Sequence, residues 1–406
     1  MPDAVIVATA RSPIGRARKG SLRSIRADDL AVQMVNAALG KVPQLGPNDI
    51  DDLMLGCGLP GGEQGWNMAR NVAVLAGYDH LPGATITRYC SSSLQTSRMA
   101  FHAISAGEGD VFISAGVESV SHYDKGTSDH IPGQAITNPR FDAAVARSDE
   151  SADADAWRDP RERDDVPNVY IAMGQTAENV QRVIGMSRQE QDAFAVRSQQ
   201  LAVAAIDSGF WAAEIDSVTL ADGTVVAADD GPRRGATLGS VGQLPPVFRP
   251  DGTVTAGNSC PLNDGAAALI IMSDEKARAL DLTPLARIVS TGLSALSPEI
   301  MGLGPVEASR RALARAGMTI DDVDLVEINE AFAVQALGSA QQLGVPLEKL
   351  NVNGGAIAIG HPFGMTGART TVTLMNALRQ RDQTVGLQSM CVGGGMGMAM
   401  IIERLA

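Results

Sequence analysis

The sequence predicts a layered α/β fold, and three observations support this class. Strand-like apolar runs alternate with helical periods along most of the 406 residues. The order of these elements recurs in the two halves of the chain, which indicates an internal repeat. Hydrophobic residues make up 45% of the chain, an ordinary share for a globular protein with large cores.

The first copy of the repeat starts with a short buried strand, because AVIVATA is a continuous apolar run bounded by polar residues. The predicted strands of this half are AVIVATA (4–10), DDLMLGCG (51–58), GATITRYC (83–90) and GDVFISAGVES (109–119). Its predicted helices include ADDLAVQMVNAAL (27–39) and LQTSRMAFHAI (94–104), where apolar residues recur at helical spacing.

The second copy repeats this order with little shared identity. Its predicted elements are LARIVSTGLS (285–294), a helix over PVEASRRALARAG (305–317), DVDLVEINEAFA (322–333), a strand, loop and helix over 349–378, and QTVGLQSMCVGGGMGMAMII (383–402). In this register His361 falls opposite Cys90. Two halves packed face to face would bring those two loops together.

The region between the halves, residues 121–253, differs from both in composition. Its acidic stretch near residues 140–165 predicts a solvated lobe or a mobile loop. Two helical patterns follow at 168–185 and 187–209, and SRQE at the start of the second has capping-box spacing. Gly209 should end that helix. We therefore divide the chain into a first half (1–120 and 254–280), an inserted loop domain (121–253) and a second half (281–406).

Charge and cysteine content narrow the possible functions. Lys and Arg number 33 and Asp and Glu number 46, and the net charge of −13 argues against a nucleic-acid partner. No apolar run is long enough to span a membrane, and we expect no signal peptide. Four cysteines without paired spacing predict reduced thiols in the cytoplasm and no metal site.

Cys90 is the first candidate for chemistry. The stretch TRYCSSSLQ (87–95) places its thiol where a helix begins, and a helix start favours the thiolate, which is the nucleophilic form. The plain alternative is a buried cysteine that serves as a small hydrophobe. His361, in the glycine-rich loop GGAIAIGHPFGMTGAR (354–369), supplies the possible base for an activated thiolate.

Two further segments could take part. Cys391 precedes three glycines, which suit a loop whose N–H groups approach a carbonyl oxygen better than they suit a strand interior. A core-strand cysteine is the alternative. Asn329 and Glu330 end a strand-like run, where they could equally cap the next helix.

These residues resemble the thiolase family of acetyl-CoA acyltransferases, and the resemblance covers essentially the whole chain. The motifs that carry it are RYCSSSLQ (88–95), INEAFA (328–333) with GGAIAIGHPFGMTGAR, and CVGGGMG (391–397). It implies two similar βαβαβαββ halves in an α/β/α/β/α core, with an inserted loop domain. It also implies reversible cleavage of 3-ketoacyl-CoA by coenzyme A, in fatty-acid or related β-oxidation, by a homodimer or homotetramer.

The resemblance assigns roles residue by residue. Cys90 would carry the acyl group, His361 would activate it, and Cys391 would move the proton of the acetyl α-carbon. Asn329 would position a water in one oxyanion hole, and the N–H groups of Cys90 and Gly393 would form the other. Coenzyme A would be a substrate and not a permanently bound cofactor, contacted by Arg233, Phe248, Ala256, Cys260, Met173 and Phe332.

The chain departs from this pattern in the walls of the coenzyme and substrate site. Many short-chain members have His-Met where this chain has Ala172-Met173, and the family's coenzyme-contacting serine is replaced by Cys260, followed by Pro261. The acidic stretch also looks longer. These departures favour a degradative enzyme acting on longer chains.

Three alternatives remain. One is a biosynthetic enzyme that condenses two acetyl-CoA. Another is a decarboxylating ketoacyl synthase, which lacks a second cysteine in a glycine-rich loop, so Cys391 argues against it. The third is a catalytically silent lipid carrier or scaffold, which could have lost Cys90, His361 or Cys391, and all three are present.

Overall fold

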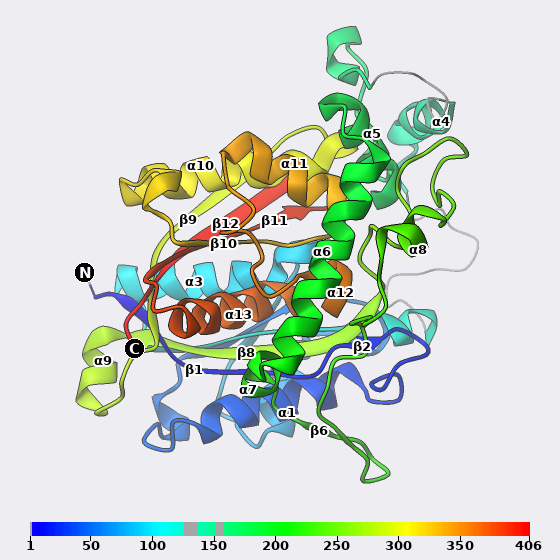
Figure 1. The fold of residues 1–406 in the computed structure, drawn as a ribbon. Helices are drawn as coiled ribbons and strands as arrows, with labels where there is room; N and C mark the ends of the chain where they lie inside the picture. Colours follow the sequence, from blue (N-terminus) through cyan, green and yellow to red (C-terminus); the bar gives the residue numbers. More distant parts are fainter. Residues whose placement is uncertain (1, 126–136, 151–156) are drawn as a thin grey trace.

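The computed structural model describes residues 2–125, 137–150 and 157–406, and it confirms the layered α/β fold (Figure 1). The strands of the first half are β1 (Ala4–Arg11), β2 (Gly15–Arg16), β3 (Asp52–Cys57), β4 (Gly83–Ile86), β5 (Val111–Ser119) and β8 (Asn263–Ser273). Its helices are α1 (Ala27–Gly40), α2 (Met68–Leu75), α3 (Ser92–Ala106) and α9 (Asp274–Ala279).

The second half repeats most of this order. Its strands are β9 (Ala286–Ala295), β10 (Leu325–Ile328), β11 (Val385–Val392) and β12 (Met396–Arg404). Its helices are α10 (Gly304–Ala316), α11 (Ala333–Leu343), α12 (Ala356–Ile359) and α13 (Thr366–Gln380).

The strands form two groups that meet at a narrow junction. Hydrogen bonding gives the order β10-β11-β12-β9-β1-β8-β5-β3-β4, with β2 beside β8. The two groups join only where β1 pairs with β9, through Val5 with Arg287 and Ile6 with Ala286. Elsewhere the halves are separate sheets, and β8 belongs to the first because it pairs with both β1 and β5.

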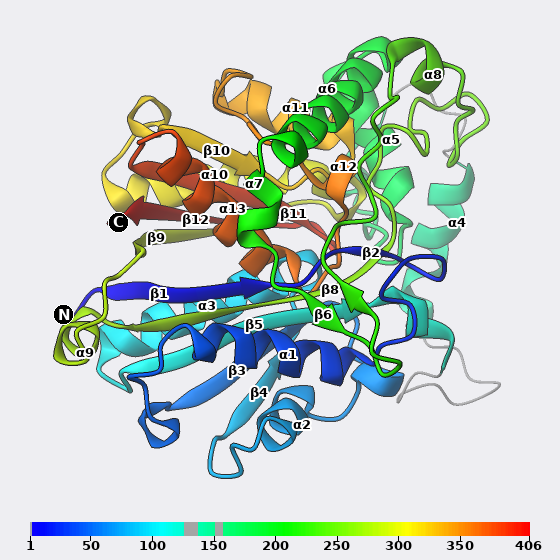
Figure 2. The same ribbon diagram turned by 60° about the horizontal axis from the view of Figure 1, so that its bottom comes forward.

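Helices α3 and α13 fill the space between the two sheets, while α10 and α11 cover the outer face of the second half (Figure 1). Figure 2 shows α1 and α2 against the outer face of the first half. Helix α13 is buried on nearly all sides, as a helix in a middle layer must be. Gly367 permits its close approach to α3, because a Cβ there would lie 2.2 Å from the backbone nitrogen of Leu94.

One predicted element is absent. The repeat predicts a strand at the start of 349–378, but the chain forms turns there and makes one isolated parallel bridge, Val326 with Leu350. The sequence NVNGG explains the difference, because Asn351 and Gly354 adopt φ angles of 44° and 81°. Asn and Gly tolerate this left-handed region, which is incompatible with a strand.

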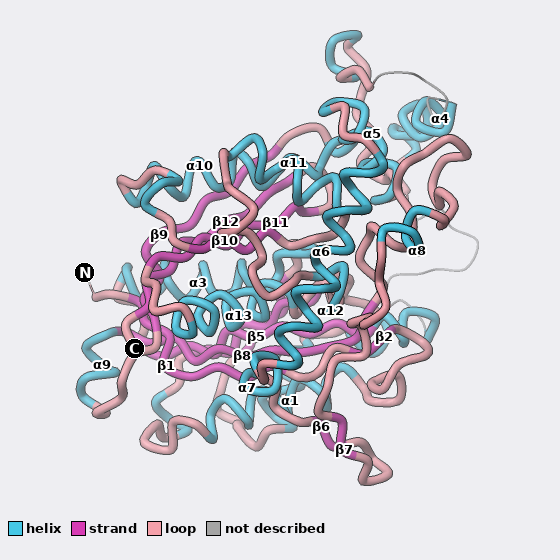
Figure 3. Tube along the Cα trace, in the orientation of Figure 1, coloured by secondary structure: helices cyan, strands magenta, loops and turns pink. Residues whose placement is uncertain are grey.

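The inserted segment contains α4 (Asp142–Glu150), α5 (Met173–Ile184), α6 (Arg188–Asp207), α7 (Phe210–Glu214), β6 (Val218–Thr219), β7 (Val225–Val226) and α8 (Leu238–Gly242). The predicted capping box is present, since Ser187 and Glu190 exchange hydrogen bonds at the start of α6. Gly209 follows the end of α6 with φ 77°. Figure 3 shows that much of the chain around α8 is loop.

Residues 151–156 of the acidic stretch at 140–165 lie outside the described residues. For them, the solvated lobe or mobile loop stays a prediction. The part before the gap is largely α4. Among the described residues, no helix combines the length and apolar character needed to cross a membrane.

Candidate active site

Cys90 lies on a tight turn between β4 and α3. Residues 89–91 form one 3₁₀ turn that continues into the helix. Tyr89 has a φ of 44°, a conformation that aromatic residues rarely adopt and that costs roughly 1–3 kcal/mol. The Ser92 hydroxyl stabilises the turn, because it donates to the Tyr89 carbonyl at 2.6 Å and accepts from the Arg88 N–H at 2.9 Å. The turn presents the half-buried Cys90 thiol at its tip.

The expectation that the helix start favours the Cys90 thiolate is wrong, because desolvation of the thiol outweighs the effect of the backbone donors. Burial raises the pKa of the Cys90 thiol to about 11, against an ordinary value of 9.0. Backbone N–H groups of Gly393 and of Cys90 itself donate to the sulfur and lower its pKa, but desolvation is the larger effect. The resting nucleophile is therefore a neutral thiol that needs a base. The same two N–H groups are those predicted to form an oxyanion hole.

His361 is held as a neutral imidazole of defined orientation. Burial, and to a smaller extent the Arg369 charge, lowers the pKa of the His361 imidazole to about 3. The Thr366 hydroxyl donates its proton to the Pro362 carbonyl at 2.7 Å, so its oxygen accepts from Nδ1–H of His361, also at 2.7 Å. The lone pair of Nε2 then faces Asn329, whose Nδ2 lies 3.3 Å away. His361 can accept a proton only at Nε2.

We predict that Thr366→Val lowers kcat about tenfold or more, with little change in KM, for the 3-ketoacyl-CoA cleavage that the resemblance implies. Valine keeps the shape of threonine but removes the oxygen that selects the His361 tautomer. Steady-state kinetics will measure the effect, and Thr366→Ser, which retains the hydroxyl, should stay near wild type. Equal losses in the two variants, or a matching fall in melting temperature, would show that Thr366 acts only in packing.

Asn329 faces the same space. Its Oδ1 is buried and receives no hydrogen bond from the described part of the protein. Its backbone N–H donates to the Ser389 carbonyl at 3.0 Å, which fixes the residue at the end of β10. An unpaired amide oxygen beside His361 is compatible with the predicted water-positioning role, which remains a prediction.

Three thiols lie close to one another. Burial is the main cause of the raised pKa of Cys260, about 12, and of Cys391, which lies well above its ordinary value. In each case the charge that Cys90 would carry raises the pKa further. Cys260 is placed by its N–H, which donates to the Ala331 carbonyl at 3.0 Å. The substituted serine position thus lies beside both predicted catalytic cysteines.

Cys90 opens into a cavity of about 420 Å³, here called the thiol pocket. It is lined by Gly58, Leu59, Tyr89, Cys90, Val169, Tyr170, Ile171, Ala172, Met173, Phe363, Gly393 and Gly394. Most of this lining is apolar or aromatic, and Ala172 contributes only a methyl group. The loop that carries His361 reaches the same cavity through Phe363, whose ring packs 5.1 Å from the imidazole.

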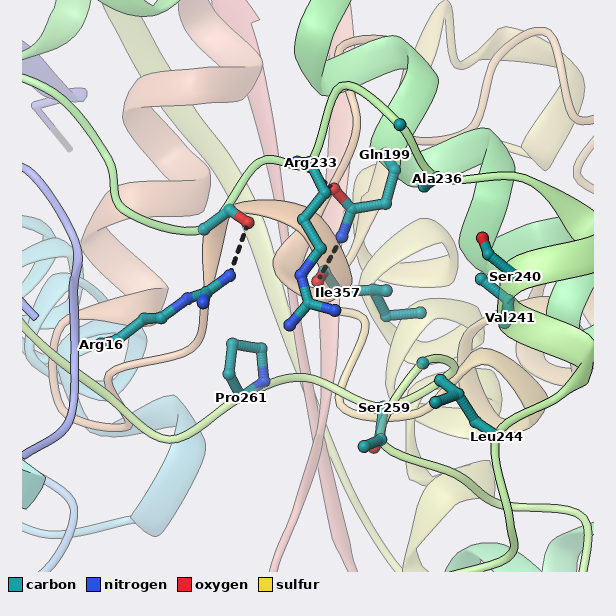
Figure 4. Close-up of a pocket in the computed structure, with 14 residues that line it drawn as sticks. Arg16, Gln199, Arg233, Ala236, Ser240, Val241, Leu244, Ser259, Pro261 and Ile357 are labelled. Atoms are coloured by element: carbon teal, nitrogen blue, oxygen red, sulfur yellow. Dashed lines mark hydrogen bonds between the residues drawn. The ribbon is translucent and has the colours of Figure 1, made fainter. Parts of the chain in front are cut away.

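Figure 4 shows a second cavity, of about 360 Å³, here called the arginine pocket. Its lining is Arg16, Gln199, Gly231, Arg233, Gly235, Ala236, Ser240, Val241, Leu244, Ala256, Gly257, Ser259, Pro261 and Ile357. Ser259 and Pro261 flank Cys260 in sequence, so Cys260, which interacts with Cys90, lies next to this pocket. The predicted coenzyme contacts Arg233 and Ala256 lie on its wall.

Of the remaining predicted contacts, Met173 lies on the wall of the thiol pocket. Met173, Phe248, Cys260 and Phe332 belong to one apolar cluster with Cys391. The rings of Phe248 and Phe332 meet edge to face, 6.2 Å apart. The structure therefore gathers all the predicted site residues into one continuous region between the two halves and the inserted segment.

Sequence reasoning missed Glu118, which ties the loops of the site together. This fully buried carboxylate accepts hydrogen bonds from the N–H groups of Gly58 at 2.7 Å, Leu59 at 3.2 Å and Gly364 at 2.8 Å. It also accepts from the Gln64 amide and the Tyr123 hydroxyl. The available signal was a charged residue within the apolar strand 109–119. Thr366, five residues after His361, had no comparable signal.

A layered α/β fold with a thiol, a neutral imidazole and converging backbone donors beside apolar pockets defines an acyltransferase that works on thioesters. Comparison with known proteins agrees. Residues 4–275 match the family profile "Thiolase, N-terminal domain", and residues 282–404 match "Thiolase, C-terminal domain". The chain belongs to the thiolase family.

Its relatives extend over the whole chain. It is 42% identical over 417 residues to the 3-ketoacyl-CoA thiolase of Bacillus subtilis (strain 168), covering 99% of this chain and 100% of the relative. A crystal structure of the Bacillus anthracis acetyl-CoA acetyltransferase superposes with a TM-score of 0.86 at 37% identity, covering 100% and 99% of the two chains. The dimeric peroxisomal thiolase of Saccharomyces cerevisiae gives 0.88 at 34%, covering 99% and 97%.

Proposed function

We propose that this protein is a degradative thiolase that cleaves 3-ketoacyl-CoA with free coenzyme A to give acetyl-CoA and a shortened acyl-CoA. The observation that carries this proposal is that Cys90 and the His361 loop meet at the thiol pocket with Cys391 close to Cys90, in a chain related end to end to 3-ketoacyl-CoA thiolases. Coenzyme A enters as a substrate, and the chemistry needs no permanently bound cofactor.

The first half-reaction transfers the acyl group to the enzyme. Nε2 of His361 takes the Cys90 proton as the sulfur attacks the 3-keto carbonyl carbon, so the thiol ionises only as its bond to carbon forms. Collapse of the adduct breaks the C2–C3 bond, leaves the acyl group on Cys90 and releases the enolate of acetyl-CoA. Cys391 donates its proton to C2 of that enolate. The Cys90 and Gly393 N–H groups, together with the His361–Asn329 pair, stabilise the charge on oxygen.

The second half-reaction uses free coenzyme A. Its thiol loses a proton to the Cys391 thiolate left by the first half-reaction and attacks the acyl-Cys90 carbonyl. Collapse releases the shortened acyl-CoA, and Cys90 recovers the proton that His361 took. Both cysteines thus finish in the neutral thiol form that their raised pKa values favour.

The thiol pocket favours acyl chains longer than four carbons. Its volume of about 420 Å³ and its apolar lining can shelter several methylene groups, and each buried methylene contributes about 0.8 kcal/mol. Ala172 lies on this wall, where the short-chain members noted above carry an imidazole. Condensation of two acetyl-CoA, the biosynthetic alternative, would leave most of this volume unused.

The test compares kcat/KM for thiolysis of acetoacetyl-CoA with that of six- to ten-carbon 3-ketoacyl-CoA esters. We expect the longer esters to be cleaved at least as efficiently as acetoacetyl-CoA. Ala172→His is the matched variant, and it should reduce the preference for longer chains by narrowing the pocket. A steep fall in kcat/KM for wild-type enzyme with esters longer than four carbons would show that acetoacetyl-CoA is the main substrate. Absence of cleavage with every ester would favour the silent carrier or scaffold.

We also propose that the protein works in the cytoplasm as a homodimer or homotetramer. All four cysteines are free thiols, as expected in a reducing compartment. The yeast relative is described as dimeric. The edge strand β4 is only half-buried and pairs on one side with β3, so its other side can pair with a second subunit.

A further inference from the structure

Arg16 shares the wall of the arginine pocket with Arg233, although nothing in the sequence motifs singles it out (Figure 4). It belongs to the short strand β2, which pairs antiparallel with β8 through Arg16 with Asn263. The two arginines thus come from segments more than two hundred residues apart. Figure 4 shows both side chains facing the space above Pro261.

The two segments that carry these arginines are bound to each other. The Asp230 carboxylate accepts from the N–H of Arg16 at 2.9 Å and from the N–H of Ser21 at 2.8 Å. Nη2 of Arg16 donates to the Gly231 carbonyl at 3.2 Å. The N–H of Arg233 donates to the Gln199 side chain at 2.8 Å. The backbones of both arginines are therefore held in place, and the Arg16 side chain is anchored at one of its nitrogens.

Positive charge remains unpaired at this point. Nε of Arg16 is buried and has no hydrogen-bond partner within the described chain, and neither Arg16 nor Arg233 forms an ion pair with another described residue. By contrast, the neighbouring Arg234 pairs with Asp207 at 2.6 Å. In a chain of net charge −13, two arginines without an ion pair on one pocket form a local cationic site that can bind an anionic group.

We infer that Arg16 binds a phosphate of the coenzyme A nucleotide, alongside Arg233, and so makes the enzyme selective for nucleotide-bearing thioesters. This inference rests on the proposed function. Coenzyme A combines a 3′-phosphate and a diphosphate with an uncharged pantetheine arm. The apolar wall of the arginine pocket, formed by Val241, Leu244 and Ala256, suits that arm, which then passes Cys260 toward Cys90.

The test combines a substrate that lacks the nucleotide with an enzyme variant that lacks the Arg16 charge. Arg16→Gln should lower kcat/KM about tenfold for a 3-ketoacyl-CoA with free coenzyme A. It should leave kcat/KM unchanged for the corresponding 3-ketoacyl-pantetheine with free pantetheine. Arg16→Lys, which keeps the charge, should recover part of the loss. Lys19→Gln is the matched control, because Lys19 is exposed in the same basic run and does not line the pocket.

Dephospho-CoA identifies the phosphate. If the variant's defect disappears with this analogue, Arg16 binds the 3′-phosphate; if the defect persists, Arg16 binds the diphosphate. Equal defects with coenzyme A and pantetheine substrates, or no defect with either, would overturn the inference. Titration calorimetry with coenzyme A alone tests the role of Arg16 independently of catalysis, and weaker binding by Arg16→Gln than by the wild type would support that role. An enzyme that cleaves no thioester would refute the proposed function without deciding the role of Arg16.

Discussion

Cys90→Ser will reduce thiolysis of 3-ketoacyl-CoA by about 10⁴-fold or more, the largest effect we expect from one substitution. A serine hydroxyl is far less acidic and less nucleophilic than a thiol. The burial that raises the pKa of Cys90 to about 11 would suppress ionisation of serine further. The measurement is the rate of acetyl-CoA formation under saturating coenzyme A.

A direct observation of the intermediate complements the rate. Wild-type enzyme mixed with a 3-ketoacyl-CoA in the absence of free coenzyme A should gain one acyl mass on the peptide that contains Cys90. Cys90→Ser should gain none, and Cys57→Ser is the control for a buried thiol that does not line the thiol pocket. An acyl mass on Cys260 or Cys391 in the wild type would show that the nucleophile has been misassigned.

Cys391→Ala will lower turnover about 10³-fold while leaving Cys90 able to accept an acyl group. The methyl side chain cannot donate a proton to the acetyl-CoA enolate or remove one in the reverse direction. The decisive measurement is exchange of the acetyl-CoA methyl protons with deuterated water, followed by nuclear magnetic resonance. Exchange should be lost in this variant, although an acyl donor should still label Cys90.

Cys260→Ala provides the matched control for this experiment. Cys260 is also a buried thiol with a raised pKa near Cys90, but it lies on the side of the arginine pocket. It should retain proton exchange and show a changed KM for coenzyme A. Normal exchange in Cys391→Ala combined with lost exchange in Cys260→Ala would reverse the roles of the two thiols.

Periodicity predicted the fold well because most elements are long and one face or both faces are buried. The failure before His361 has a local cause: NVNGG could be aligned with a strand of the first half, but Asn351 and Gly354 prefer turn conformations. The order of the helices and strands predicted the position of the site better than the assignment of each segment as helix or strand. It placed His361 opposite Cys90, and the structure brings their two loops to one pocket.

Electrostatic properties of the site could not be predicted in the same way. The sign of the Cys90 pKa shift depends on how deeply the turn is buried, and a helix start in the sequence carries no information about depth. Glu118 and Arg16 were missed because their partners lie far along the chain. Glu118 binds Gly364, 246 residues away, and Arg16 binds Gly231, 215 residues away. No local pattern records such contacts.

The narrow junction between the two sheets bears on how such a protein could arise. Cys90 lies in one copy of the repeat, whereas His361, Asn329 and Cys391 lie in the other. An ancestral single unit, even assembled as a pair of identical subunits, would have carried the same residue at both matched positions. The present division of labour therefore required the two copies to differ in sequence, so that one carries a thiol where the other carries an imidazole. Asymmetry between duplicated units, rather than the fold alone, is what permits this chemistry.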